Sequence, residues 1–173
     1  MIMYVSGGAR SGKSGFAQQM ALQLSAEPVY VATAKIWDED FAERIARHKR
    51  ERGPEWTCIE AEQNIHLQPV MNRVAVIDCV TLWLTNLFFT HKEDIEKTLA
   101  AFKAEIDGLL MLEGTFIIIS NEIGMGVHAA TEVGRKFTDL QGWANQYVAS
   151  KADEAIFMVS GLPLWLKNPD QIR

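Results

Sequence analysis

Cysteine is scarce in this sequence of 173 residues, which contains only Cys58 and Cys79 and no Cys-x-x-Cys pair. That scarcity argues against a disulfide scaffold and against a thiolate zinc site. We therefore expect two free, buried thiols in a protein of the reducing cytoplasm. Proline and glycine, at 5 and 12 residues, are too few for a long low-complexity linker. The length predicts a single domain, which we expect to span residues 1–167 with a fraying tail over 168–173.

An excess of positive charge is also absent. Seventeen Lys and Arg face twenty-two Asp and Glu, so the formal net charge is −5. Phosphate-backbone binding needs a basic surface, and we therefore expect no nucleic-acid partner. No apolar run reaches the roughly 18 residues that a transmembrane helix requires, so no transmembrane segment is expected. The N-terminus lacks the basic leader and the apolar length of a signal peptide.

The apolar runs that are present are short and continuous, at residues 2–5, 29–32, 74–77, 115–119 and 155–159. Continuous runs are typical of strands that are buried on both faces of a parallel sheet. Between them lie stretches with the apolar spacing of helices, at residues 13–25, 38–52, 95–112 and 131–151. The alternation predicts an α/β fold with a mostly parallel sheet. Residues 57–73 are ambiguous and are compatible with a short strand at 57–60 and a short helix.

The strongest motif is a phosphate-binding loop that directly follows the first expected strand and opens the first expected helix. It fits G-x-x-x-x-G-K-[ST] and consists of Gly7, Gly8, Ala9, Arg10, Ser11, Gly12, Lys13 and Ser14. Glycines allow several backbone N–H groups to point at one anion, and the helix N-terminus adds partial positive charge. The motif predicts nucleotide binding, with Lys13 on the β and γ oxygens and the Ser14 hydroxyl on Mg²⁺.

A second magnesium ligand is expected at Asp78, the acid that ends the apolar run over 74–77. A carboxylate at the end of a buried strand is typical of the Walker-B position in a P-loop protein. The same residue could instead cap a helix that begins near Thr81. The N-K-x-D motif by which GTPases recognise guanine is absent, so any guanine specificity must come from other residues.

One charged face of the expected helix over 38–52 carries His48, with basic neighbours at Lys49, Arg50 and Arg52. One interpretation is a solvated helix with i,i+4 ion pairs. The other is a nucleophilic histidine, because neutral imidazole is available near pH 7 and nearby cations lower its pKa and neutralise phosphate oxygens. The remaining histidines are weaker candidates: His66, His91 and His128.

Beyond these motifs, the chain resembles over essentially its full length the bifunctional adenosylcobinamide kinase/adenosylcobinamide-phosphate guanylyltransferase family of cobalamin biosynthesis. The more specific matching strings are Arg44-Ile45-Ala46-Arg47-His48-Lys49 and Ser120-Asn121-Glu122-Ile123-Gly124-Met125-Gly126. The resemblance implies a P-loop NTPase-like (RecA-like) sheet flanked by helices, and a homotrimer.

The resemblance also implies two reactions. ATP or GTP phosphorylates the hydroxyl of adenosylcobinamide; GTP then guanylylates a histidine, and GMP passes to adenosylcobinamide phosphate to give adenosylcobinamide-GDP. The guanylylated histidine falls on His48. Besides the phosphate loop, the nucleotide-contacting positions fall on Thr33, Ala34, Lys35, Lys49, Arg50, Glu51, Arg52, Glu60 and Asp78. The acid after the third strand is often Glu in the family, so the shorter Asp78 is a departure.

Other functions remain open at this point. A plain small-molecule kinase would form no histidyl adduct, and a GTP-dependent switch would transfer nothing to a corrinoid. The corrinoid-contacting residues are not assignable from the sequence. Exposed aromatics are candidates, with burial in the core as the alternative: Trp37, Trp83 and Trp143.

Overall fold

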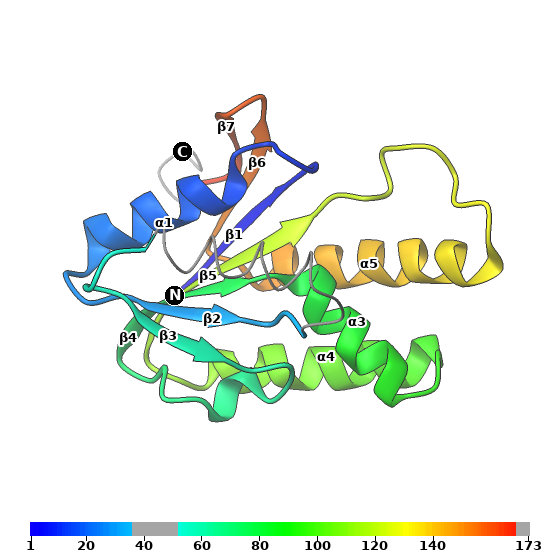
Figure 1. Cartoon of the computed structure of the whole chain (residues 1–173), viewed down its shortest axis with the longest axis horizontal. Helices are drawn as coiled ribbons and strands as arrows, with labels where there is room; N and C mark the ends of the chain where they lie inside the picture. Colours follow the sequence, from blue (N-terminus) through cyan, green and yellow to red (C-terminus); the bar gives the residue numbers. More distant parts are fainter. Residues whose placement is uncertain (36–51, 169–173) are drawn as a thin grey trace.

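The computed structural model describes residues 1–35 and 52–168, and seven strands of this part form one sheet. The order across the sheet is β3-β2-β4-β5-β1-β6-β7 (Figure 1). All neighbouring strands are parallel except β6 and β7, which form an antiparallel pair. The α/β class and the mostly parallel sheet are thereby confirmed. The strands are β1 (Ile2–Gly7), β2 (Val29–Ala32), β3 (Thr57–Glu60), β4 (Arg73–Asp78), β5 (Gly114–Asn121), β6 (Glu154–Val159) and β7 (Leu162–Lys167).

Burial of the strands follows their position in the sheet. Every residue of β1 is buried, as are the middle residues of β4 and β5, whereas β3 and β7 at the two edges are largely exposed. The central strands have continuous apolar sequences because helices cover both of their faces.

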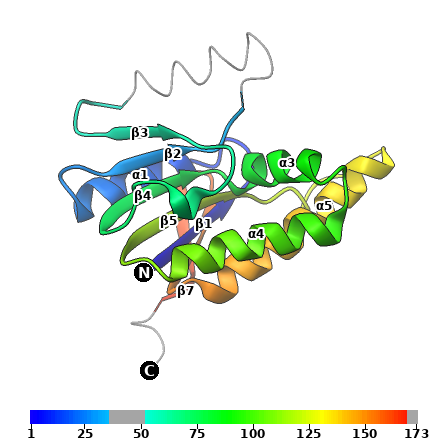
Figure 2. The same ribbon diagram turned by 90° about the horizontal axis from the view of Figure 1, so that it is seen from below.

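Helix α1 (Lys13–Leu24) covers one face of the sheet, and three helices cover the other (Figure 1). These three are α3 (Val80–Thr90), α4 (Ile95–Leu110) and α5 (Glu132–Lys151). Helices α4 and α5 lie side by side (Figure 2). The larger hydrophobic cluster lies on their face and contains Trp83, whose ring packs edge-on against Phe102 with centroids 5.0 Å apart. Trp83 is fully buried, so its candidacy as an exposed corrinoid contact was wrong.

Most of the predicted elements are confirmed within two residues at their ends. The ambiguous region over 57–73 holds strand β3 and a 3₁₀ turn at Ile65–Leu67. Edge strand β7 was not anticipated, and helix α3 was anticipated only as the helix near Thr81 that Asp78 could cap. The helix expected over 38–52, apart from Arg52, and the tail over 169–173 lie outside the described residues.

The two cysteines differ in exposure. Cys79 is buried as expected, and burial raises the pKa of its thiol to about 12. Cys58 is exposed on edge strand β3, so the expectation that both thiols are buried was wrong. Among the described residues, β3 pairs with one strand only, β2, and an edge strand is less covered than the central strands.

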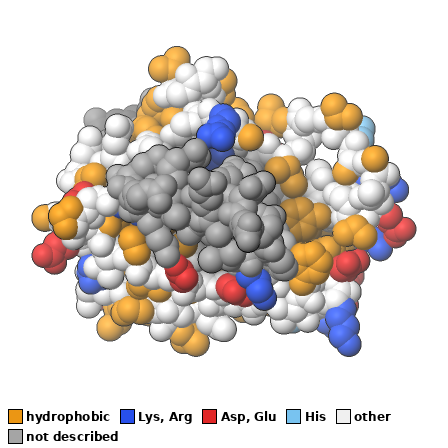
Figure 3. All heavy atoms as spheres, in the orientation of Figure 1, with side chains coloured by type: hydrophobic (Ala, Val, Ile, Leu, Met, Phe, Trp, Pro, Cys, Tyr) orange, Lys and Arg blue, Asp and Glu red, His pale blue; other side chains and the backbone are white. Residues whose placement is uncertain are grey.

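Two surface properties of the described residues bear on partners. No helix among residues 1–35 and 52–168 is long and apolar enough to cross a membrane. On the face shown in Figure 3, basic and acidic side chains of the described part are interspersed. That distribution agrees with the small negative net charge of −5.

Candidate nucleotide-binding site

The phosphate loop joins the end of β1 to the start of α1, and close packing fixes its backbone. A Cβ on Gly7 would lie 2.6 Å from Ser11 Oγ and 2.7 Å from the Met158 carbonyl oxygen, so no side chain fits there. Gly12 is the N-cap of α1, with a left-handed φ of 92° and no side-chain cap. The first-turn N–H groups of the helix are therefore directed at the loop, as in an anion-binding helix N-terminus.

Lys13 is buried at the base of this loop, and its Nζ donates a hydrogen bond to the Gly8 carbonyl oxygen at 2.9 Å. Burial lowers the pKa of the Lys13 ammonium, and the negative charge of Asp78 opposes that shift. A polyphosphate bound to the loop would supply further negative charge and favour the ammonium form.

A cavity of about 490 Å³ opens between the phosphate loop and the end of β5. Residues 9–15 line it on one side, and Asn121, Glu122 and Ile123 line it on the other. The Glu122 backbone N–H donates to the Gly7 carbonyl oxygen at 3.0 Å, which ties the two sides together. Asn121 and Glu122 were not among the predicted site residues. Their position after a parallel strand was the available signal, because ligands bind beyond the carboxyl ends of such strands.

Asp78 ends β4, and its Oδ2 accepts a 2.6 Å hydrogen bond from the Tyr30 hydroxyl on β2. Burial and the neighbouring carboxylate raise the pKa of Tyr30 well above its usual range, so the phenol remains a donor. The N-cap of α3 is Cys79 rather than Asp78. Asp78 is thus held by a phenol and faces the charge of Lys13.

Arg52 lies over the same tyrosine, with its guanidinium carbon 3.7 Å from the Tyr30 ring centroid. Tyr30 also meets Trp56 edge-on at 6.0 Å between centroids. Arg52 is only 8% exposed, and its Nε and Nη1 have no hydrogen-bond partner among the residues that the structure describes. A buried cation with unused donors favours an anion nearby. Of the two interpretations of the basic run, the solvated helix face does not apply to Arg52.

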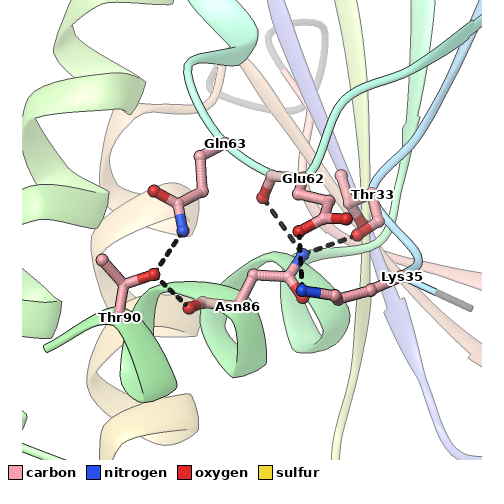
Figure 4. A network of polar contacts seen from close by, with 6 residues as sticks. All are labelled: Thr33, Lys35, Glu62, Gln63, Asn86 and Thr90. Carbon is pink, nitrogen blue, oxygen red and sulfur yellow. Dashed lines mark hydrogen bonds and ion pairs between the residues drawn. The ribbon is translucent and has the colours of Figure 1, made fainter. Parts of the chain in front are cut away.

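The turn after β2 is held mainly by hydrogen bonds between buried side chains and backbone atoms (Figure 4). The Thr33 hydroxyl donates to the Cys79 carbonyl oxygen and accepts from the Cys79 N–H, both at 2.8 Å. Asn86 Nδ2 donates to the carbonyl oxygens of Thr33 and Glu62 at 2.8 and 3.1 Å. Lys35 Nζ lies 3.7 Å from Glu62 Oε2 at the exposed end of this turn.

The predicted site residues within the described part gather along one edge of the sheet. The phosphate loop follows β1, residues 33–35 follow β2, and Glu60 and Asp78 end β3 and β4. They meet because parallel strands all end on the same edge. The predicted nucleophile and its neighbours lie outside the described residues: His48, Lys49, Arg50 and Glu51.

The other two tryptophans considered as corrinoid contacts differ from the buried Trp83. Trp143 is 46% exposed on α5 and lines a surface groove with Leu99 and Tyr147 between α4 and α5, apart from the phosphate-loop cavity. Trp37 lies outside the described residues.

The donor set suits magnesium. Mg²⁺ commonly keeps several waters and takes one or two carboxylates together with substrate phosphates. The Ser14 hydroxyl and the Asp78 carboxylate fit that pattern. Within residues 1–35 and 52–168 no group of three His, Cys, Asp or Glu forms a dedicated metal cage, and Mg²⁺ at a phosphate loop does not require one.

Comparison with known proteins identifies relatives over nearly the whole chain. The family model described as "Cobinamide kinase / cobinamide phosphate guanyltransferase" matches residues 3–166. "Bifunctional adenosylcobalamin biosynthesis protein CobP" of Pseudomonas aeruginosa is 35% identical, covering 95% of this chain and 96% of its own length. "Bifunctional adenosylcobalamin biosynthesis protein CobU" of Escherichia coli is 33% identical, covering 96% and 100%. Among solved structures, flagellar accessory protein FlaH from Methanocaldococcus jannaschii aligns with 96% of this chain and 78% of its own, at 16% identity and a TM-score of 0.48.

Proposed function

Because this chain belongs to the cobinamide kinase / cobinamide phosphate guanyltransferase family, it is a bifunctional transferase, and we propose how its residues divide the two reactions. In the first, ATP or GTP phosphorylates the hydroxyl of adenosylcobinamide. In the second, GMP passes from GTP through a guanylyl-histidine to adenosylcobinamide phosphate, giving adenosylcobinamide-GDP and pyrophosphate.

Both reactions use the phosphate loop to hold the polyphosphate. The observation that carries this assignment is the fixed loop at the N-terminus of α1, with Lys13 buried beneath it and Asp78 facing that lysine. Backbone N–H groups and the Lys13 ammonium stabilise charge that develops on the phosphate oxygens. Ser14 and Asp78 would hold Mg²⁺, and the bound ion would neutralise phosphate charge.

His48 is the nucleophile of the guanylyl transfer. Its neutral imidazole nitrogen attacks the α-phosphorus of GTP, a P–N bond forms, and the bond to the departing pyrophosphate breaks. An oxygen of adenosylcobinamide phosphate then attacks the same phosphorus and releases the imidazole. Support comes from Arg52, which lies over the ring of Tyr30, the hydrogen-bond donor to Asp78, and has two unused buried donors. Arg52 and the adjacent Lys49, Arg50 and Glu51 contact the nucleotide, as do residues 33–35 and Glu60.

The cellular compartment and the oligomeric state of the enzyme are proposed on grounds other than the geometry of the site. Free cysteines are typical of a reducing cytoplasm, where we place the protein. The homotrimer rests on the family resemblance. Light scattering of the purified chain is expected to give three times 19.4 kDa, and a monomer mass would contradict the trimer.

Covalent labelling tests the proposed mechanism. Incubation with α-³²P-GTP is expected to leave an acid-labile, base-stable label on the wild-type protein. The His48→Asn variant is expected to carry no label, because no other residue is proposed to attack the α-phosphorus. His91→Asn is the matched control, since His91 is the C-cap of α3, and it should label normally.

A second variant tests the phosphate loop. Lys13→Ala is expected to lose both phosphorylation of adenosylcobinamide and protein labelling, because both reactions need the same polyphosphate site. Full activity of Lys13→Ala would contradict the loop assignment, and stable labelling of His48→Asn would remove His48 from the mechanism. Phosphorylation with no protein label at all would instead favour a plain kinase.

A further inference from the structure

A carboxylate other than the proposed magnesium ligand Asp78 faces the phosphate-loop cavity. Among the described residues that line the cavity, Glu122 alone carries a carboxylate. Its Oε1 accepts a 3.0 Å hydrogen bond from the Gly124 N–H, and its Oε2 lies 3.5 Å from Asn145 Nδ2. Both donors are uncharged, so the carboxylate is oriented without being neutralised by an ion pair.

A buried polar network fixes the amide that orients Glu122. Asn145 Oδ1 accepts hydrogen bonds from Ser120 Oγ at 2.6 Å and from Gln141 Nε2 at 2.9 Å. Gln141 Nε2 also donates to Ser120 Oγ at 3.0 Å, and all three side chains are buried. Because the oxygen of the Asn145 amide is occupied, its NH₂ group points toward the Asn121 carbonyl oxygen, at 3.2 Å, and toward Glu122. Helix α5 thus holds the carboxylate against the end of β5.

The chemistry of the kinase reaction needs a group of this kind. A hydroxyl that attacks a phosphorus atom must lose its proton, whereas the phosphate-loop side of the cavity presents donors: backbone N–H groups and Lys13. A general base must lie within hydrogen-bond reach of the proton that it accepts. Glu122 is the acceptor that the described chain places opposite the polyphosphate loop.

We propose that Glu122 is the general base of the phosphorylation reaction and takes no part in guanylyl transfer, an assignment that rests on the proposed function. The acceptor hydroxyl oxygen forms a bond to the γ-phosphorus, the bond from that phosphorus to the bridging oxygen breaks, and the nucleoside diphosphate leaves. The hydroxyl proton passes to a Glu122 carboxylate oxygen. In the second reaction the acceptor is a phosphate monoester, whose second pKa is about 6, so it is already ionised near pH 7 and needs no base.

Separate assays of the partial reactions test this assignment on the full-length protein. The assays are phosphorylation of adenosylcobinamide, protein labelling by α-³²P-GTP, and conversion of supplied adenosylcobinamide phosphate to adenosylcobinamide-GDP. Glu122→Gln is expected to lower the kinase kcat by about 10²- to 10⁴-fold, the usual contribution of general-base catalysis. The other two activities should stay within about threefold, and Glu122→Asp should recover part of the kinase activity.

The pH profile separates a base from a merely structural residue. The wild-type kinase kcat should fall at acid pH as the base is protonated, and the residual activity of Glu122→Gln should lack that limb. Glu113→Gln is the matched control, because Glu113 is exposed just before β5 at its opposite end.

Two outcomes would overturn the assignment alone: a Glu122→Gln kinase within threefold of wild type, or an equal loss of all three activities. A wild-type protein that labels but never phosphorylates adenosylcobinamide would overturn the proposed function and the assignment together. The two failures are therefore distinguishable.

Discussion

Strands β4 and β5 are neighbours in the sheet and bring an acid each to the same edge, yet the two acids have different surroundings. Asp78 accepts a 2.6 Å hydrogen bond from a phenol and faces the charge of Lys13. Glu122 accepts hydrogen bonds from a backbone N–H and an amide, at 3.0 and 3.5 Å. One acid is tied to the cation of the phosphate loop, and the other faces the cavity.

The difference arises because the partners come from opposite faces of the sheet. Tyr30 belongs to the smaller hydrophobic cluster under α1, whereas Asn145 lies on α5, on the face of the larger cluster. A single sheet edge can therefore hold two carboxylates with separate tasks, since each is oriented by a different layer. We expect Asp78 to serve both reactions through the nucleotide and Glu122 to serve one.

The largest effect on both reactions together is expected from Asp78→Asn. Loss of this carboxylate should lower both the kinase and the guanylyl-transfer activities by at least about 100-fold, because even outer partners of a metal ligand commonly contribute 10- to 100-fold. The measurement is the ratio of the two activities in Asp78→Asn and in Glu122→Gln. If Asp78→Asn left either reaction at its wild-type rate, Asp78 would not serve both reactions and the proposed contrast with Glu122 would fail.

A smaller effect is expected from Tyr30→Phe, which removes the hydrogen bond to Asp78 and keeps the ring under Arg52. A hydrogen bond to a charged group contributes about 1.5–3 kcal/mol, so the Mg²⁺ concentration for half-maximal activity should rise by roughly 10- to 100-fold in both reactions. Tyr147→Phe is the matched control, because Tyr147 makes a similar bond to Asp107 at 2.5 Å outside the cavity. A Mg²⁺ requirement unchanged in Tyr30→Phe would show that the phenol does not orient the carboxylate.

The smallest expected effect is a shift of the alkaline limb in the pH profile of kcat/KM for the nucleotide. Burial lowers the pKa of Lys13, and its charged form is therefore lost as the pH rises through that lowered value. Since Asp78 opposes the shift, Asp78→Asn should move the limb to lower pH, whereas Glu122→Gln should leave it in place. An equal displacement in both variants would mean that Glu122 also faces the lysine.

The sequence predicted the central strands and the phosphate loop because their determinants are local. A continuous apolar run marks a strand covered on both faces, and the loop motif lies within eight residues. Helix α3 had a local pattern that went unused: Val80, Trp83, Leu84, Leu87 and Phe88 are buried at helical spacing. Apolar residues outside that period, Leu82 and Phe89, obscured it, and the helix packs against both the sheet and α4.

Strand β7 was missed for another local reason. Ser160 and Gly161 both have positive φ, at 52° and 81°, and form the two-residue turn of a β6–β7 hairpin. This turn is a recognised hairpin signal, but the strand that follows contains Pro163, and proline within a run argues against a strand other than at a sheet edge, where β7 lies.

The sequence by itself determined that this chain binds a nucleotide, because a glycine-rich turn before a helix forms an anion site whatever packs around it. It also supplied the family, through strings that are far apart in the chain. Only the tertiary structure decided which polar groups meet at the sheet edge. Tyr30 reaches Asp78 across 48 residues and Asn145 reaches Glu122 across 23, because parallel strands carry separate segments to one edge and helices on both faces orient the side chains there.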